Sequence, residues 1–242
     1  MLLKTRGIVL HSVAYSDAHI IIPVYTEDFG LVSYLVSRHR NKKSRASSLL
    51  YQPLSILNLE VEHYPVRDIQ KIKEAQRHLL LAELMFNPMK SSIVLFLAEF
   101  IYRISKELQA NRQVFGFIVE SLRVLDLLED GIANFHLVFM IRMSRFLGFY
   151  PDDDTYKEHS YFDLQDGVFV ERPTPFHPYL NMEESRIFRL LLRMNYDNMS
   201  KFRFSRNDRV LIINRIFEFY RLHLVAFIDM KSLQVLQDVF NF

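Results

Sequence analysis

The sequence predicts an α+β protein in which a five-stranded β-barrel of the OB-fold type precedes an all-α C-terminal domain with a small irregular insertion. Within about the first 75 residues, apolar and polar side chains alternate at 4–12 and 57–62, which is typical of half-buried strands, and residues 18–26 are rich in Ile and Val. From about residue 79 the apolar side chains recur every three or four positions, as in helices. We therefore expect a barrel domain at residues 1–78 and a helical domain at 79–242, with the insertion at 149–180.

Five short strands fill the first domain, and five such strands are the number in an OB-type barrel. Glu27-Asp28-Phe29-Gly30 is a turn that ends in the glycine such turns favour. Pro65 ends the fourth strand because it cannot donate a ladder hydrogen bond. The fifth segment also suits a helix, since Ile69 and Ile72 lie three residues apart. The expected strands are residues 4–12, 18–26, 31–37, 57–62 and 67–75.

The helical domain has recognisable helix starts and stops. Asn87 and Pro88 fit the cap and first position of a helix. Ser205 and Asp208 resemble a capping box, with Asp in place of the usual Glu. The expected helices are residues 88–108, 113–128, 132–147, 183–194 and 208–228, with Gly131 and Gly148 as stops.

The irregular insertion is interrupted by prolines and aspartates. Residues 161–164 and 168–171 form an expected hairpin around Asp166-Gly167. Asp152–Asp154, with His159 and His177 nearby, could supply hard-metal ligands. Three adjacent acids after a proline also fit a solvated turn, and the spacing matches no known metal-binding loop.

Several functional classes lack their usual signals. The chain has no cysteine, so disulfides, thiolate nucleophiles and sulfur-ligated zinc are excluded. It contains no phosphate-binding glycine loop, no G-x-S-x-G and no H-E-x-x-H. The first residues resemble no signal peptide, and no apolar run reaches the length of a membrane span. We expect a cytoplasmic protein with no membrane partner and no catalytic residues.

The positive charge of the first domain is concentrated in one short segment. Residues 1–80 hold eleven Lys and Arg against seven Asp and Glu, whereas the remainder holds nineteen against twenty-one. Five of the eleven lie between Arg38 and Arg45, in a loop between expected strands. Such a loop can neutralise phosphates, and an exposed aromatic beside it can stack on bases; a solvated connection is the alternative. The expected DNA-binding residues are Lys4, Arg6, Tyr34, Arg38, Arg40, Lys42, Lys43 and Arg45.

Apolar grooves between the helices suit a partner's hydrophobic tail, with arginines at the rim to receive a carboxylate. Simple solvation of a helix face is the alternative for each arginine. The candidate rim residues are Arg142, Arg145, Arg215 and Arg221.

Short segments at both ends of the chain resemble the RecO family of bacterial recombination mediators, in matching order and spacing. They are Thr5–Leu10 with Tyr15-Ser16-Asp17, Tyr25–Leu31, Lys42–Arg45, Gln52-Pro53-Leu54, Leu147-Gly148-Phe149, Tyr220–Leu224 and Lys231–Leu236.

The resemblance implies an N-terminal OB-fold and a helical C-terminal domain. It also implies a protein that binds single- and double-stranded DNA, anneals complementary strands and works with RecR. Partners implied in the same way are the C-terminal tail of single-strand DNA-binding protein and, indirectly, RecA. The setting implied is recombinational repair at the bacterial nucleoid. A different class remains open, namely a helical protein-interaction module whose barrel binds RNA or partner proteins.

The chain departs from the family at one point. Many relatives carry four cysteines after the Leu-Gly-Phe junction, where zinc holds the loop, but residues 151–178 contain none. We therefore expect no zinc and no other cofactor. Packing would instead hold the loop, through Tyr156, Tyr161, Phe162, Phe169 and Phe176.

Overall fold

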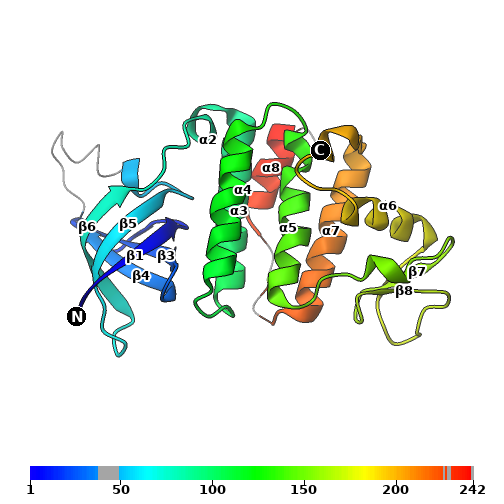
Figure 1. The fold of residues 1–242 in the computed structure, drawn as a ribbon, viewed down its shortest axis with the longest axis horizontal. Coiled ribbons are helices and arrows are strands. Elements are labelled where there is room, and N and C mark those ends of the chain that lie inside the picture. Colours follow the sequence, from blue (N-terminus) through cyan, green and yellow to red (C-terminus); the bar gives the residue numbers. More distant parts are fainter. Residues whose placement is uncertain (38–48, 226, 228–229, 241–242) are drawn as a thin grey trace. The chain divides into compact units, whose positions relative to one another are not determined.

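The computed structural model describes residues 1–242 except 38–48, 226, 228–229 and 241–242 (Figure 1). Contacts between Cα atoms divide the chain into two compact units. The first comprises Met1–Asp126 with Met230–Leu233, and the second comprises Leu127–Asp229 with Gln234–Phe242. The predicted domain boundary at residues 78 and 79 stays a prediction.

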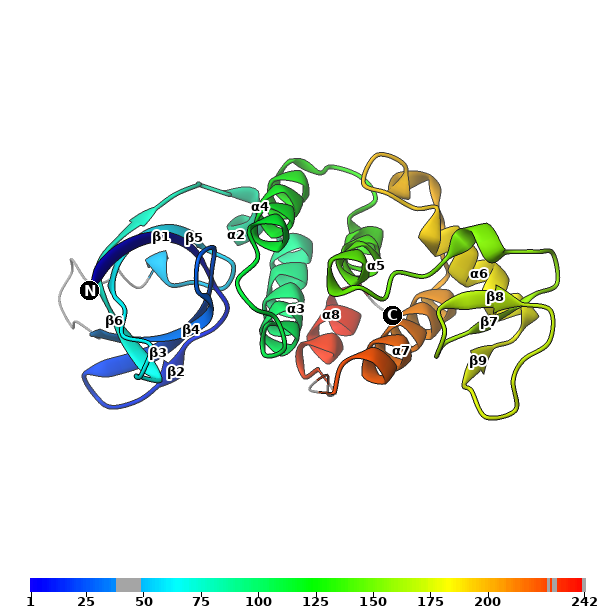
Figure 2. The same cartoon turned by 60° about the horizontal axis from the view of Figure 1, so that its bottom comes forward.

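The first unit contains a closed five-stranded barrel, which confirms the OB-fold prediction (Figure 2). Hydrogen bonds run in the order β1-β5-β6-β4-β3, and β3 pairs again with β1 to close the ring. The β4–β6 pair is parallel and the other barrel pairs are antiparallel. Of the two alternatives for the fifth segment, the strand is correct. The strands are β1 (Leu2–Val9), β2 (Val13–Ala14), β3 (His19–Thr26), β4 (Gly30–Ser37), β5 (Ile56–Glu62) and β6 (Ile69–Arg77).

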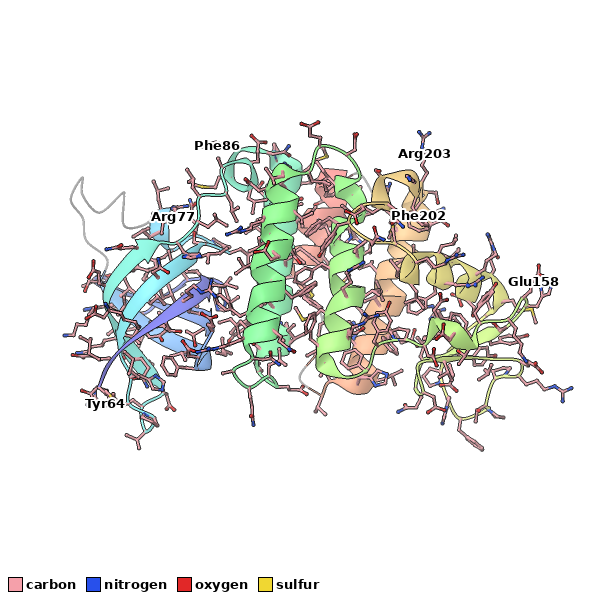
Figure 3. The ribbon with its side chains drawn as sticks, in the orientation of Figure 1. Tyr64, Arg77, Phe86, Glu158, Phe202 and Arg203 are labelled. Atoms are coloured by element: carbon pink, nitrogen blue, oxygen red, sulfur yellow. The ribbon has the colours of Figure 1, made fainter. Side chains whose placement is uncertain are left out.

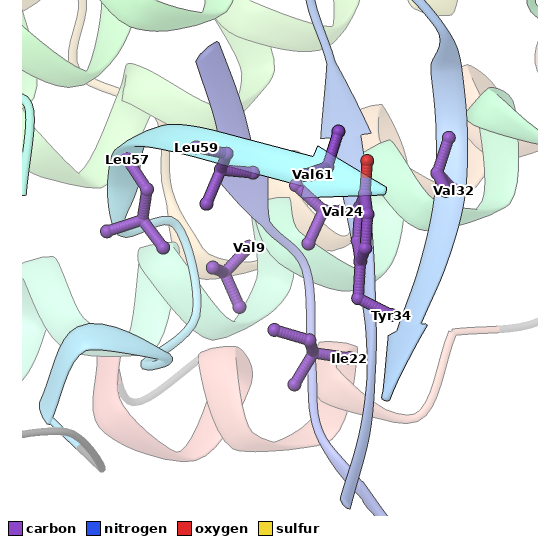
Figure 4. Packing of buried hydrophobic residues seen from close by; sticks show 8 residues of the cluster. All are labelled: Val9, Ile22, Val24, Val32, Tyr34, Leu57, Leu59 and Val61. Carbon is purple, nitrogen blue, oxygen red and sulfur yellow. The ribbon is translucent and has the colours of Figure 1, made fainter. Parts of the chain in front are cut away.

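Alternate side chains of the barrel strands form its interior (Figure 4). Leu57, Leu59 and Val61 of β5 point inward, as their spacing of two predicts. The interior is completed by Val9, Ile22, Val24, Val32 and Tyr34.

Three helices follow the barrel in the same unit, namely α2 (Glu83–Phe86), α3 (Pro88–Ser105) and α4 (Arg112–Leu127). The Asn87 side chain accepts hydrogen bonds from the backbone N–H groups of Met89 and Lys90, which confirms the predicted cap. Helix α3 contacts β3 and β4, and Phe115 of α4 stacks on Tyr25 of β3. These helices therefore cover one side of the barrel.

Helices also dominate the second unit. Ser205 and Asp208 form the predicted capping box, and Gly148 ends a helix with φ of 87°. Helix α7 ends at His223, five residues before the predicted end, because Leu224 is extended. The helices are α5 (Phe135–Leu147), α6 (Met182–Leu192), α7 (Arg206–His223) and α8 (Ser232–Phe240), with short 3-10 turns η1 (Ile132–Asn134), η2 (Asp153–Thr155) and η3 (Met199–Lys201).

The insertion forms a small sheet of β7 (Tyr161–Asp163), β8 (Val168–Val170) and β9 (Tyr179–Leu180), in the order β8-β7-β9. This confirms the hairpin around Asp166-Gly167. Phe162 packs against Phe169 and against Phe188 of α6. The expectation that Phe176 also packs was wrong, because that side chain is 92% exposed.

Candidate nucleic-acid interface

The basic cluster of the sequence follows directly on strand β4. Ser37 is the last residue of that strand, and the cluster begins at the next position. Its five cationic residues lie outside the described residues, so their role in DNA binding stays a prediction. They are Arg38, Arg40, Lys42, Lys43 and Arg45.

Arg6, a second predicted DNA contact, is held by an ion pair. Its guanidinium donates to both carboxylate oxygens of Glu27, with Nε–Oε2 and Nη2–Oε1 distances of 2.8 and 2.6 Å. The hydrogen bond from Arg6 lowers the pKa of Glu27. The same guanidinium lies 5.2 Å from the centre of the Phe115 ring. Arg6 therefore links β1 to the β3–β4 turn and to α4.

Lys4 is exposed on the same strand and lines a hollow of about 390 Å³ together with Arg6. The two cations share this hollow with four carboxylates, so its surroundings do not favour a phosphate. The acidic residues are Glu27, Asp28, Glu60 and Glu74.

Tyr34 is not exposed, although the prediction that it stacks on bases required an exposed ring. Its side chain is fully buried inside the barrel (Figure 4). Burial also raises the pKa of its hydroxyl. The turn at Glu27–Gly30 correctly indicated a strand after it, but it does not tell which of the two alternating sets of side chains faces inward.

Helices α3 and α4 cover part of the outer surface of β3 and β4, which belongs to the usual ligand surface of an OB-type barrel. Tyr25 of β3 is fully buried, and burial raises its pKa to about 12. Asp28, in the β3–β4 turn, accepts a 2.8 Å hydrogen bond from Arg112 of α4. The hydrogen bonds from Arg112 and from Thr5 lower the pKa of Asp28. Helix α4 therefore covers Tyr25 and the β3–β4 turn.

The predicted rim arginines of the second unit have close neighbours. Arg215 donates to Glu184 at 2.6 Å and to Glu218 at 2.7 Å, so two carboxylates already neutralise it. Arg142 and Arg145, both exposed on α5, lie over the rings of Tyr196 and Tyr150. Arg221 is exposed on α7. Their role in binding a tail stays a prediction.

One group among the described residues has the composition of a metal site. Ligand atoms of Asp163, Asp166 and His177 lie within 4.8 Å of one another. Asp163 is buried and already accepts hydrogen bonds from the backbone N–H groups of Gln165 and Asp166, while its second oxygen lies 2.9 Å from His177 Nδ1. The bonds from Gln165 and Asp166 close the β7–β8 turn, and the contact with His177 joins this turn to the segment before β9.

The predicted acidic cluster, Asp152–Asp154, fits the alternative of a local turn. Asp152 caps η2 by accepting from the backbone N–H of Asp154, and Asp153 pairs with Arg189. The expectation of no metal and no cofactor stays a prediction.

Comparison with known families gives two matches in sequence order. The family model described as "Recombination protein O N terminal" matches residues 1–78. The model described as "Recombination protein O C terminal" matches residues 85–233. The first match coincides with the closed barrel.

The chain is also similar along its whole length to curated bacterial proteins, each named "DNA repair protein RecO". It is 46% identical over 241 residues to that of Azobacteroides pseudotrichonymphae and 42% identical over 242 residues to that of Phocaeicola vulgatus. The identity to the protein of Flavobacterium psychrophilum is 32% over 244 residues. Each alignment covers both chains completely. No helix among the described residues is long and apolar enough to cross a membrane.

Proposed function

The chain belongs to the recombination protein O family of DNA repair proteins, and from this premise we propose that it is a DNA-binding recombination mediator that acts without catalysing a reaction. The observation that carries the proposal is the match of the N-terminal family model to the closed barrel, a fold that often binds nucleic acid. The function proposed is binding of single- and double-stranded DNA during recombinational repair in the bacterial cytoplasm, at the nucleoid.

The basic segment after β4 would supply the phosphate contacts. Neutralising phosphates on two strands lowers their mutual repulsion, which favours the annealing of complementary strands. The helical region would bind the C-terminal tail of single-strand DNA-binding protein and, with RecR, help load RecA. Such tethering raises the local concentration of the partners without a chemical step.

We expect substitution of Arg40, Lys42, Lys43 and Arg45 by Ala to weaken DNA binding and to flatten its salt dependence. Each lost phosphate contact should reduce the slope of log K against log salt by about 0.7 for a single strand. Fluorescence anisotropy of a labelled single-stranded oligonucleotide, titrated at several salt concentrations, measures both quantities.

The control is a second variant that loses the same four positive charges elsewhere in the chain. Arg172, Arg186, Arg193 and Lys201 are exposed in the second unit, and their substitution by Ala should leave the slope unchanged. An unchanged slope in the loop variant would remove this segment from the interface. No binding by the native chain at low salt would instead favour the interaction module that binds RNA or proteins.

A further inference from the structure

The hairpin between β5 and β6 ends in a turn that a buried glutamine holds in place. Gln70 is only 3% exposed. Its side-chain oxygen accepts from the Tyr64 N–H at 2.9 Å, and its nitrogen donates to the carbonyls of Tyr64 and Arg67 at 2.8 and 2.6 Å. A fourth hydrogen bond joins the Arg67 N–H to the Tyr64 carbonyl. The turn is therefore ordered before any partner binds.

This turn, residues 64–67, presents an unusual set of side chains to solvent. Val66 is 94% exposed and Tyr64 is 38% exposed. The Arg67 guanidinium lies over the Tyr64 ring, 4.5 Å from its centre. Figure 3 shows Tyr64 at the edge of the barrel. An aromatic ring supported by an arginine is the arrangement on which bases of a single strand stack.

The charges around the turn are of both signs. Asp68 follows Arg67 directly, and Lys73 of β6 is paired with Glu62 of β5 at 2.9 Å. Lys71 and the N-terminal amine also act on Glu62, so cations lie beside the surface that the turn offers for stacking. Its few exposed apolar side chains also fall far short of the roughly 800 Å² per partner that a stable protein interface buries.

We propose that the turn at residues 64–67 is a base-stacking site for single-stranded nucleic acid, with Tyr64 as the stacking ring. This inference rests on the proposed function and adds a second contact to it. The position of the turn supports it, because the connection between the fourth and fifth barrel strands is one of the loops with which OB-folds bind oligonucleotides.

The stacking site and the basic segment leave the barrel at opposite ends of β4. Ser33 of β4 pairs with Ile69, the first residue of β6, and the turn at 64–67 lies just before Ile69 in the sequence. The basic segment begins at the other end of β4, after Ser37.

The test compares the native chain with Tyr64→Ala and Tyr64→Phe. Each protein is titrated against two labelled oligonucleotides of equal length, an oligothymidylate and an abasic strand that carries the same phosphates. Tyr64→Ala should weaken binding of the oligothymidylate by about fivefold or more and leave the abasic strand unaffected. Tyr64→Phe retains a ring and should bind like the native chain.

Tyr179→Ala is the matched control, since Tyr179 is 44% exposed in the small sheet of the second unit. The salt slope should be the same in all variants, unlike that of the basic-segment variant. Equal losses on both strands, or no loss, would overturn the stacking site while leaving the proposed function standing. Failure of the native chain to bind either strand would overturn both.

Discussion

At the scale of single residues, Gly30 couples the β3–β4 turn to the start of α4. Its φ is +66°, a conformation that costs other residues about 1–2 kcal/mol. A Cβ at this position would lie 3.1 Å from the backbone nitrogen of Ala110. We therefore expect Gly30→Ala to lower the free energy of unfolding by about 2 kcal/mol, measured by urea denaturation.

Gly116 provides the opposite case within the same unit. It lies inside α4, and a Cβ there would meet nothing within 4 Å. Gly116→Ala should therefore raise the free energy of unfolding by about 0.5–1 kcal/mol.

If the Gly30→Ala variant were as stable as the native chain, neither the positive φ of Gly30 nor its close approach to Ala110 would constrain the β3–β4 turn.

The sequence predicts the role of a residue when that role depends on its neighbours along the chain. It does not predict a role that depends on residues far away in the sequence. Gly30 was expected in a turn because glycine favours such turns, but Ala110 lies eighty residues further along the chain. Arg6 pairs with Glu27, twenty-one residues away, while its predicted contact with DNA stays a prediction. Tyr34 was expected at the surface, because predicting a strand does not tell which of its side chains face inward.

At the scale of secondary-structure elements, Glu99 of α3 caps the start of α8. Its carboxylate accepts from the backbone N–H groups of Lys231 and Ser232, at 3.2 and 2.8 Å, and from Arg103 at 3.1 Å. Burial raises the pKa of Glu99, but the hydrogen bonds from Ser232, Lys231 and Arg103 outweigh it and the pKa lies below its ordinary value. The ionised form is therefore the one that the fold stabilises.

We expect Glu99→Gln to lower the free energy of unfolding at pH 7 by about 1 kcal/mol, because the charge at the helix start is lost. A carboxyl whose pKa is lowered on folding stabilises the protein above its unfolded pKa, and this contribution disappears as the pH falls through the folded value. The difference between native chain and variant should therefore shrink below about pH 4. Urea denaturation at several pH values measures it.

Glu120→Gln is the control for that series. Glu120 is exposed on α4 and lies 3.6 Å from Arg123, a surface pair of small expected effect. A Glu99→Gln effect that stays constant as the pH falls from 7 to about 3 would show that its charge does not stabilise the fold.

Long elements were predictable, whereas short ones were predictable only where a turn signal marked them, as Asp166-Gly167 does between β7 and β8. Helices such as α3 and α4 repeat their apolar pattern over several turns, which makes the period readable. Strands β2 and β9 contain two residues each and α2 contains four, too few to show any period. The end of α7 was placed too late because its apolar residues continue beyond Leu224.

At the scale of the whole molecule, the change of periodicity and the division into compact units fall at different places. The pattern changes from strands to helices near residue 79, whereas the first unit extends to Asp126 and includes α3 and most of α4. Periodicity reports the type of local structure. It does not report which elements pack together, so the cover that these helices form over β3 and β4 could not be read from the sequence.

This difference predicts how fragments of the chain behave. A fragment of residues 1–78 would expose Tyr25 and the rest of the barrel surface that α3 and α4 bury, at a cost of roughly 25 cal/mol per Å² of apolar area. A fragment of residues 1–126 keeps that surface covered. We expect the longer fragment to unfold cooperatively on heating, and the shorter one to melt at a clearly lower temperature or without a cooperative transition, as measured by circular dichroism. Equal melting temperatures would show that the barrel is stable alone and would support a domain boundary at residue 78.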